Sequence, residues 1–290
     1  MLNLRRLAPA FTLAIMLAIF ASPALGQTVI EPCPATPAKP AITATPAKTV
    51  SQTKQTVVDA NIPADPAVEQ MLKPYSEKVR ALNTVIGRLD GSLKKDGIGA
   101  GTLGNFVTDA VRAQAQARLG KPVTLVIMNS GGLRKNEISP GELRASDIFE
   151  LLPFENALVA LEVDGAQLTK LLAVATRDAQ AGARIQFKWD DKNRAEFVSG
   201  KIVDANGREQ EIDPQKTYTV VTIDYLLRLG SGPYALLQEA KSQKPLNVTL
   251  RDAVMDYVKA ETAAGRSIRS RVDNRYVQIG PDRKPREEPR

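Results

Sequence analysis

Hydrophobic residues recur at two different periods along this chain, and the change of period separates expected helices from expected strands. Residues 65–82 follow a helical spacing, and Asp65-Pro66 has the sequence of a helix start, with Asp as N-cap and Pro at the first helical position. Pro74 lies inside this pattern, and we expect it to kink the helix or shift its start. The apolar positions of this expected helix are Val68, Leu72, Tyr75, Val79 and Leu82.

The rest of the chain up to residue 279 alternates short apolar runs with further helical patterns. Turn signals such as Asp164-Gly165 and Asn206-Gly207 separate the runs, and the Asn-Gly pair predicts a hairpin. Mixed strands and helices with hairpins predict an α+β domain rather than a purely parallel sheet. Strands are expected at 84–89, 123–128, 158–163, 184–189, 197–203 and 218–223, and helices from Leu103 to a stop at Gly120, after Gly165, and at 248–262.

Residues 123–156 carry more chemistry than any other stretch. A strand-like apolar run ends at the Asn-Ser-Gly-Gly turn of residues 129–132, where the glycines permit backbone angles that other residues avoid. Arg134 follows this turn. A buried strand that leads into a Gly-rich turn and a guanidinium predicts an anion-facing pocket. After a short helical turn, Phe154 adds a stacking face and Asn156 adds an amide edge.

The first residues have the pattern of a secretory signal. In residues 1–26, Arg5 and Arg6 precede an apolar run, and Ala24-Leu25-Gly26 places small residues at the cleavage positions. We therefore expect a mature chain that starts at Gln27, is exported to the periplasm or secreted, and has no membrane-spanning segment.

The segments that flank the expected domain at 65–279 differ from it in composition. Residues 27–64 are rich in Pro, Ala, Thr and Lys and supply no core, which predicts an extended, semi-rigid linker. Residues 280–290 form a charged, Pro-containing tail that we expect to be disordered. Cys33 is the only cysteine, so no intrachain disulfide is possible, and an incidental exposed thiol is favoured over an intermolecular disulfide.

The amino-acid composition excludes several kinds of catalytic and metal-binding site. The 290 residues include no histidine, which excludes a His general base, a Ser-His pair and a His-bound metal within this sequence. Ser130 and Ser231 lie in Gly-rich turns that resemble nucleophile sites, but no His activates them. The acidic pairs Asp190-Asp191 and Glu287-Glu288 lie in polar stretches and are poor metal ligands. The net charge of +7 is scattered rather than gathered in a basic stripe, so we expect no nucleic-acid partner.

Residues 99–104 match the pattern G-x-G-x-x-G, which in other contexts marks a dinucleotide site. Residues 92–96 before it are not a buried strand, and no acidic residue closes the following strand, so the dinucleotide interpretation is disfavoured. A flexible entry to a helix is favoured. Docking of a phosphate on free backbone N–H groups at the helix start remains open as an alternative.

Taken in order, these pieces resemble the C-terminal, substrate-recognition domain of secreted 5′-nucleotidases and UDP-sugar hydrolases. The resemblance covers about residues 66–278. Each motif is short, but seven of them occur in the order found in the family. They are Val85-Ile86-Gly87, Leu103-Gly104-Asn105 with Asp109-Ala110, Asn129-Ser130-Gly131-Gly132-Leu133-Arg134, Leu152-Pro153-Phe154-Glu155-Asn156, Val163-Asp164-Gly165, Tyr218-Thr219-Val220 and Asp273-Asn274-Arg275.

In that family the domain clamps a nucleotide base between two aromatic rings. The resemblance implies that Phe154 is the first ring, that Tyr225 is the second, and that Asn156 reaches the base edge. It implies that Arg134 meets a phosphate or carboxylate, by a bidentate, charge-assisted bond. The substrate-binding residues that it implies are Phe154, Tyr225, Asn156, Asn129, Arg134, Gly131, Gly132 and Ser231.

Two departures from the family pattern weaken the expected phosphate and ribose contacts. Residues 97–100 occupy the place where the family has an Arg and a Glu, and Ser231 stands where it has an Asp. Roles that need no ligand also stay open: Phe154 as a core residue, Arg134 as a member of a surface ion pair and Asn129 as the cap of its own turn. Trp189 is expected to serve packing.

The family's catalytic centre lies in a separate N-terminal metallophosphatase domain that binds two divalent metals. The resemblance therefore implies no catalytic residue and no cofactor for this sequence, because the metals belong to that other domain. Three hypotheses follow. The chain is an exported binding module for a nucleotide or nucleoside, the detached substrate-binding half of a two-chain 5′-nucleotidase that works with a separate metallophosphatase, or an envelope scaffold without ligand.

Overall fold

A computed structural model describes residues 57, 59 and 61–283. The expected signal, Cys33, nearly all of the expected linker and residues 284–290 lie outside the described residues. From Pro63 onward the described residues form one compact unit, which contains every helix and strand described below. Within the described part, no helix combines the length and the apolar character needed to cross a membrane.

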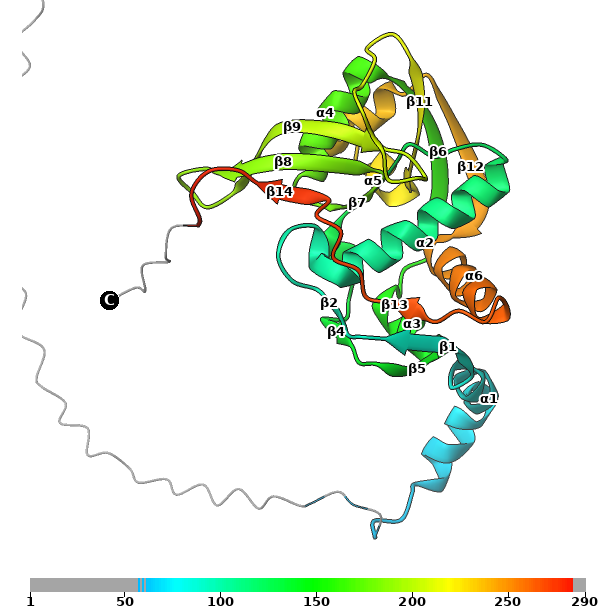
Figure 1. The fold of residues 1–290 in the computed structure, drawn as a ribbon. Helices are drawn as coiled ribbons and strands as arrows, with labels where there is room; N and C mark the ends of the chain where they lie inside the picture. The colour runs from blue at the N-terminus through cyan, green and yellow to red at the C-terminus, as the bar shows by residue number, and fades with distance from the viewer. Residues whose placement is uncertain (1–56, 58, 60, 284–290) are drawn as a thin grey trace, which may run out of the picture. The chain divides into compact units, whose positions relative to one another are not determined.

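A five-stranded sheet forms the centre of the second unit, in the order β12-β6-β11-β3-β7 (Figure 1). Its central strand, β11, runs parallel to β3, with Val221 opposite Val126. It runs antiparallel to β6, with Val221 opposite Ala160. The sequences of β3, β6 and β11 are nearly continuous apolar runs, because helices cover the sheet. The bounds are β3 Leu125–Met128, β6 Ala157–Asp164, β7 Ala179–Ala181, β11 Thr217–Ile223 and β12 Ser242–Thr249.

A four-stranded sheet, in the order β10-β9-β8-β14, lies beside the first. The predicted hairpin at Asn206-Gly207 is confirmed: it joins β9 to β10, Gly207 has a φ of 77°, and the Asp204 carboxylate accepts hydrogen bonds from the Asn206 and Arg208 N–H groups at 2.8 and 2.9 Å. The bounds are β8 Ala183–Trp189, β9 Ala195–Val203, β10 Glu209–Gln210 and β14 Tyr276–Gln278.

Two smaller sheets complete the strands. One has the order β13-β1-β5, and the other is the pair β2-β4. Only β1 of this group was predicted, because the others are too short to show a period. The bounds are β1 Val85–Asp90, β2 Leu93–Lys94, β4 Glu137–Ile138, β5 Gly141–Arg144 and β13 Ile268–Arg269.

The buried helices begin and end at residues suited to capping. Gly120 ends α2 in the left-handed conformation, as predicted, and Asp164 caps α4 by accepting a hydrogen bond from Gln167 N–H at 2.8 Å. The last helix, α6, starts two residues later than predicted, because Thr249 is its N-cap. The α+β prediction is confirmed. The bounds are α2 Gly101–Leu119, α3 Ala145–Leu151, α4 Gly165–Ala175, α5 Asp224–Leu229 and α6 Leu250–Ala263, with short 3₁₀ helices η1 Ile98–Ala100, η2 Ser130–Gly132 and η3 Gly232–Glu239.

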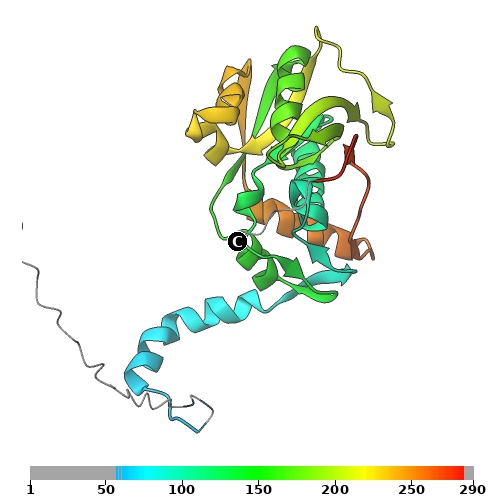
Figure 2. The ribbon, with the colours of Figure 1, turned by 90° about the vertical axis from the view of Figure 1, so that its left-hand side faces the viewer.

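The first helix, α1 (Pro66–Leu82), leaves most of its apolar face uncovered by the other described residues, and only Leu82 at its end is half-buried. It begins where predicted, since the Asp65 carboxylate accepts a hydrogen bond from the Ala67 N–H at 2.8 Å, and it continues through Pro74. None of its residues is buried, and Figure 2 shows it extending away from the sheets. The exposed apolar side chains of α1 are Val68, Met71, Leu72, Tyr75 and Val79.

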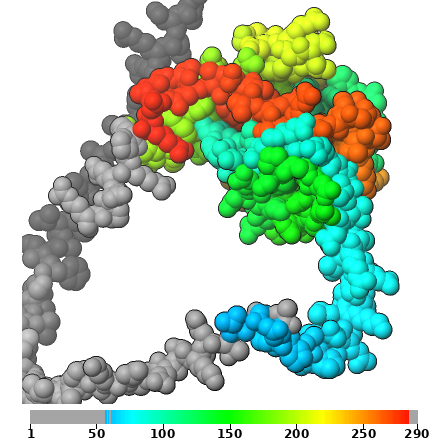
Figure 3. All heavy atoms as spheres, turned by 60° about the horizontal axis from the view of Figure 1, so that its bottom comes forward, coloured from blue at the N-terminus to red at the C-terminus, as the bar shows by residue number. Residues whose placement is uncertain are grey.

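The end of the described chain joins two of the sheets. Strand β13 pairs with β1 and β14 pairs with β8, both in parallel, and Figure 3 shows this segment as an orange and red band across one face. Between the two strands, the buried Arg275 side chain forms ion pairs with Asp109 of α2 at 3.0 Å and with Asp273 at 2.5 Å. Because breaking such a buried pair leaves an uncompensated charge, Arg275 fixes this segment on α2.

The glycines of the G-x-G-x-x-G match have steric roles at the start of α2. Gly99 and Gly101 have φ values of 69° and 55°, which favour glycine. A Cβ on Gly104 would lie 1.9 Å from the backbone oxygen of Gly99. The segment is thus a tightly packed corner rather than the expected flexible entry. The short strand before it, β2, is paired antiparallel with β4, which is not the arrangement of a dinucleotide fold.

We predict that Gly104→Ala destabilises the domain by about 1–3 kcal/mol, because the methyl group overpacks the corner. Helix propensity alone predicts a gain of up to about 1 kcal/mol, so the sign of the change separates the two effects. Urea unfolding measures it. Gly131→Ala is the matched control, because its Cβ would meet only the Asn129 side chain, at 3.7 Å. A Gly104→Ala protein that is more stable than the parent contradicts the steric role.

Candidate functional site

Six residues from three separate segments line one cavity of about 260 Å³. Phe154 and Tyr225 are two of them, and their side chains are 48% and 43% exposed although both are large and aromatic. Two aromatic rings exposed on one concave site are typical of ligand binding, because a folded protein gains no stability from leaving large apolar rings in water. The six residues are Asn129, Gly131, Gly132, Phe154, Asn156 and Tyr225.

The topology of the central sheet explains why these residues meet. Strands β3 and β11 are parallel, so both end at the same edge of the sheet, and Asn129 follows β3 while Tyr225 lies in the first turn of the helix after β11. Strand β6 is antiparallel to β11, so it begins at that edge, and Asn156 directly precedes it. Ligands commonly bind at the carboxyl ends of parallel strands.

Asp224 connects the chain segments that carry Phe154 and Tyr225. Its carboxylate accepts a hydrogen bond from the Ala157 N–H at 3.0 Å, which joins the segment of Phe154 to the helix of Tyr225. The same carboxylate forms an ion pair with Arg228, one turn along α5, at 3.0 Å. Asp224 is therefore a positioning residue for both rings.

Arg251 of α6 supports the Phe154 segment from the inside. Its side chain is 9% exposed, its guanidinium lies 4.2 Å from the centre of the Phe149 ring, and its Nη1 donates to the carbonyl oxygens of Leu152 and Pro153 at 3.4 Å. Its Nη2 pairs with Glu155. A buried guanidinium that satisfies consecutive groups of one loop restricts that loop to one conformation.

Asp178 connects the Asn-Ser-Gly-Gly turn to the 3₁₀ helix η3 that follows α5. Its carboxylate accepts hydrogen bonds from the Ser130 N–H at 3.1 Å and from the Tyr234 hydroxyl, and its carbonyl oxygen accepts one from the Tyr276 hydroxyl. Burial raises the pKa of Asp178, against the lowering effect of the Tyr234 and Ser130 hydrogen bonds. Burial and the Asp178 hydrogen bond both raise the pKa of Tyr234, so its hydroxyl stays protonated and donates.

Two of the eight predicted site residues do not line the cavity. Arg134 is exposed, and its Nη1 lies 3.5 Å from the carbonyl oxygen of Gly131, at the rim. Ser231 is exposed in the loop after α5. The turn itself contains two buried polar atoms without a hydrogen-bond partner, Asn129 Oδ1 and Ser130 Oγ. The alternative in which Asn129 caps its own turn is wrong, because its side chain makes no capping bond there.

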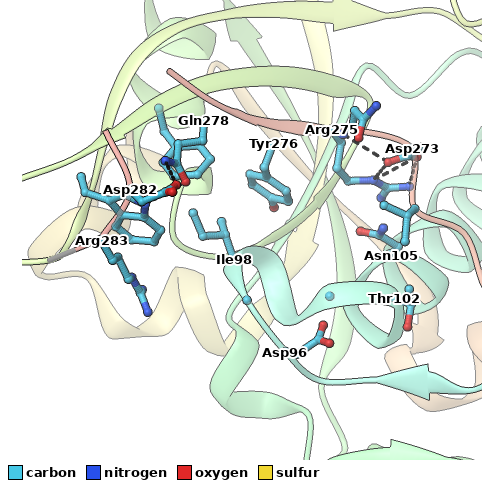
Figure 4. Close-up of a pocket in the computed structure, with 16 residues that line it drawn as sticks. Asp96, Ile98, Thr102, Asn105, Asp273, Arg275, Tyr276, Gln278, Asp282 and Arg283 are labelled. Carbon is cyan, nitrogen blue, oxygen red and sulfur yellow. Dashed lines mark hydrogen bonds and ion pairs between the residues drawn. The ribbon is translucent and has the colours of Figure 1, made fainter. Parts of the chain in front are cut away.

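A larger cavity of about 700 Å³ lies at the start of α2, beside the C-terminal segment (Figure 4). Most of its charged side chains already have partners among the described residues. Arg275 is held by Asp109 and Asp273, as described above, and the Arg283 guanidinium lies 3.8 Å from the centre of the Trp189 ring. The Trp189 Nε1 donates to Gln278 Oε1 at 3.0 Å and its ring stands edge-on to Phe187, so Trp189, which was expected to serve packing, also lines this cavity. We therefore place the candidate site in the aromatic-walled cavity.

The described part of the chain contains no group of three or more His, Cys, Asp or Glu residues arranged to hold a metal ion.

The sequence did not reveal the supporting residues Asp178, Asp224, Arg251 and Tyr234. Asp178 and Arg251 act across the fold and carry no local motif. Tyr234 has a faint signal, because it closes the Gly-rich loop that begins at Gly230. Asp224 directly follows an apolar strand, which is the placement that marks a strand-end polar residue.

Comparisons with known proteins agree with this architecture. Protein UshA of Yersinia enterocolitica is 27% identical over 59% of this chain and 30% of its own length, and the 5′-nucleotidase of Vibrio vulnificus is 28% identical over 58% and 30%. A solved 5′-nucleotidase precursor from Thermus thermophilus superposes with a TM-score of 0.60 at 22% identity, covering 76% of this chain and 44% of that one. The chain thus spans about a third of the curated relatives it matches.

The fold is α+β, and the candidate site is a cavity with two aromatic walls. The family model for the 5′-nucleotidase C-terminal domain matches residues 81–239, which is more than half of the chain. The chain belongs to this family, as the motif order predicted.

We predict that Asp178 and Tyr234 are energetically coupled. Asp178→Ala and Tyr234→Phe each remove one side of a partly buried hydrogen bond to an ionisable group, and each costs about 1–3 kcal/mol of unfolding free energy. The double variant costs less than the sum of the two, because the interaction is lost only once. Urea unfolding of the four proteins measures the coupling.

The control for these unfolding measurements is Ser199→Ala. It removes an exposed hydrogen bond to Gln186 and is expected to change the free energy of unfolding by no more than about 0.5 kcal/mol. Strictly additive effects of the two site substitutions contradict the coupling.

Proposed function

We propose that this chain is an exported recognition domain that binds a nucleoside or nucleotide by stacking its base between Phe154 and Tyr225, in nucleotide catabolism, without a hydrolase centre of its own. The observation that carries the proposal is the meeting of two exposed aromatic rings on one cavity. The family membership supports the ligand class, and the signal-like residues 1–26 support export.

The chemistry of the cavity suits a base. Its walls are aromatic, its floor includes two glycines that expose backbone, and its polar side chains are the amides of Asn129 and Asn156. Amides present a donor and an acceptor, which is what the edge of a base requires. Stacking tolerates any base, so the rings supply affinity while the amides supply selectivity.

We predict that Phe154→Ala and Tyr225→Ala each weaken binding of adenosine, AMP or UMP by about 1–3 kcal/mol, because each removes one stacking face. Isothermal titration measures the change. Tyr75→Ala is the matched control, since Tyr75 is 62% exposed but lies on α1. An absence of binding by the parent protein to every nucleoside and nucleotide tested, at millimolar ligand, removes the proposal and favours the envelope scaffold.

A second candidate function is the substrate-binding half of a two-chain 5′-nucleotidase. One observation favours it: α1 leaves its apolar face uncovered by the rest of the described chain. Val68, Leu72, Tyr75 and Val79 recur at intervals of four, three and four residues, which is the spacing of a helix seam that packs on a partner. In this proposal the partner is a separate metallophosphatase that docks on α1.

We predict that Leu72→Glu on this face prevents such a complex, because docking would bury an unpaired carboxylate. Gln70→Glu adds the same charge on the opposite face of α1 and is expected to have no effect. Pull-down with the tagged chain, followed by assay of AMP hydrolysis with Mn²⁺, measures assembly; the chain alone is expected to hydrolyse nothing. Recovery of no phosphatase, or equal recovery with both variants, contradicts this candidate.

A further inference from the structure

We propose that the cavity of about 700 Å³ at the start of α2 is a second binding site, for a ligand that carries a guanidinium group, and that Arg283 fills part of this site from within the chain. Trp189 lines the cavity, which we name the Trp189 cavity. The inference does not depend on a base between Phe154 and Tyr225, because those residues line a different cavity.

A cation already occupies the face of the Trp189 ring. The guanidinium carbon of Arg283 lies 3.8 Å from the ring centre, well inside the distance of about 6 Å over which a cation and an aromatic face attract each other. Arg283 is exposed and is the last residue that the structure describes. An exposed contact of this kind shifts an equilibrium by only about two- to fivefold, so a ligand with the same group can displace Arg283.

The Trp189 ring is oriented by groups other than Arg283. Its Nε1 donates to Gln278 Oε1 at 3.0 Å, and the Phe187 ring stands edge-on to it with the centroids 5.2 Å apart. Gln278 lies opposite Phe187 in the pairing of β14 with β8, and it donates from Nε2 to Asp282 at 2.9 Å. The ring therefore keeps its place when Arg283 leaves, and a ring held in place binds a ligand without first having to be ordered.

The charges that line the Trp189 cavity favour a cation. They are three carboxylates, Asp96, Asp273 and Asp282, and the guanidiniums of Arg275 and Arg283 (Figure 4). Arg275 is shared between Asp273 and Asp109, which lies outside the lining. Without Arg283, three acids thus face one arginine, and such a cavity attracts a cation and repels a phosphate.

Asp96 is available to meet a new cation. It is exposed, and the two lysines before it are engaged elsewhere. Lys94 forms an ion pair with Glu137 at 3.9 Å. Lys95 donates to the carbonyl oxygen of Leu133 at 2.7 Å. A guanidinium offers five N–H donors in a planar fork, so it stacks on a ring and binds a carboxylate at the same time, whereas an ammonium group lacks both the plane and the fork.

The size and the apolar part of the Trp189 cavity suit the rest of an arginine side chain. The volume lies within the range of about 300–1,000 Å³ that is typical of ligand sites. Val272 lines the cavity and is 82% exposed, and Ile98 is half-buried there. The aliphatic stems of charged side chains pack on such groups while their charged ends stay near water.

The fluorescence of the full chain tests the internal contact, because Trp189 is the only tryptophan among the 290 residues. Arg283→Ala is expected to shift the emission to longer wavelength, since the uncovered ring gains contact with water. Arg88→Ala is the control for the loss of an exposed cation, because its side chain is 71% exposed on β1. An emission that is the same in the parent and in Arg283→Ala overturns the inference.

Titration with N-acetyl-arginine amide, its lysine counterpart and agmatine tests the site itself. We expect Arg283→Ala to bind the arginine probe about two- to fivefold more tightly than the parent, because the internal competitor is absent. Asp96→Asn is expected to weaken binding by about two- to fivefold, and added salt reduces this effect. Asp90→Asn is the matched control, since Asp90 is 49% exposed on β1. Trp189→Leu, followed by calorimetry, is expected to lose measurable binding.

Tighter binding of the arginine probe than of agmatine identifies a peptide as the source of the guanidinium, and the reverse order identifies a free metabolite. Weaker binding of the arginine probe to Arg283→Ala than to the parent overturns the inference, since Arg283 then belongs to the binding surface. Equal binding of the lysine probe overturns it too, as does no binding of either guanidinium probe to Arg283→Ala at millimolar concentration. Nucleoside binding between Phe154 and Tyr225 is expected to be the same in all these variants, so failure of this inference leaves the proposed function intact.

Discussion

The parallel pairing of β3 with β11 is the constraint on which the candidate site depends. Register places Val126 opposite Val221, so the two strands end together, and the turn at Asn129 and the helix of Tyr225 leave the sheet side by side. A shift of one residue in this pairing would exchange the faces of every side chain on the strand. Because the strands are buried on both faces, that shift is expensive, and the position of the cavity walls follows from the core.

The walls themselves are held by polar groups rather than by the apolar core. Asp224 of α5, Arg251 of α6 and Asp178 of the turn between α4 and β7 each bind backbone or side-chain groups of a segment that contributes to the cavity. Irregular segments at a site need such support, because they lack the repeating hydrogen bonds of strands. The site is thus rigid at its back while its aromatic faces stay open to solvent.

Much of this architecture was predictable from local patterns. The long strands β6 and β11 stand out as apolar runs and the helix α2 shows a helical period. Gly120 marks the end of α2, and Asp164 marks the start of α4. Six of the eight predicted binding residues line one cavity, because their motifs sit at strand ends.

Other features had no local signal. Strand β12 contains Pro245, which argues against a strand, yet an edge strand tolerates proline. The apolar period of α1 predicted a helix but carried no information about what covers it. Asp178 and Arg251 act through contacts far away in sequence, and only the assembled fold identifies their roles.

The placement of Arg275 has a consequence for how the chain folds. Asp109 and Arg275 are separated by 166 residues, and β1 waits for its parallel partner β13 from the same late segment. Pairings of such long sequence separation close large loops and slow folding. A chain that emerges from its amino end therefore holds α2 with an unneutralised carboxylate and β1 with an open edge until its last strands arrive. During that interval the unfinished domain is most exposed to aggregation and proteolysis.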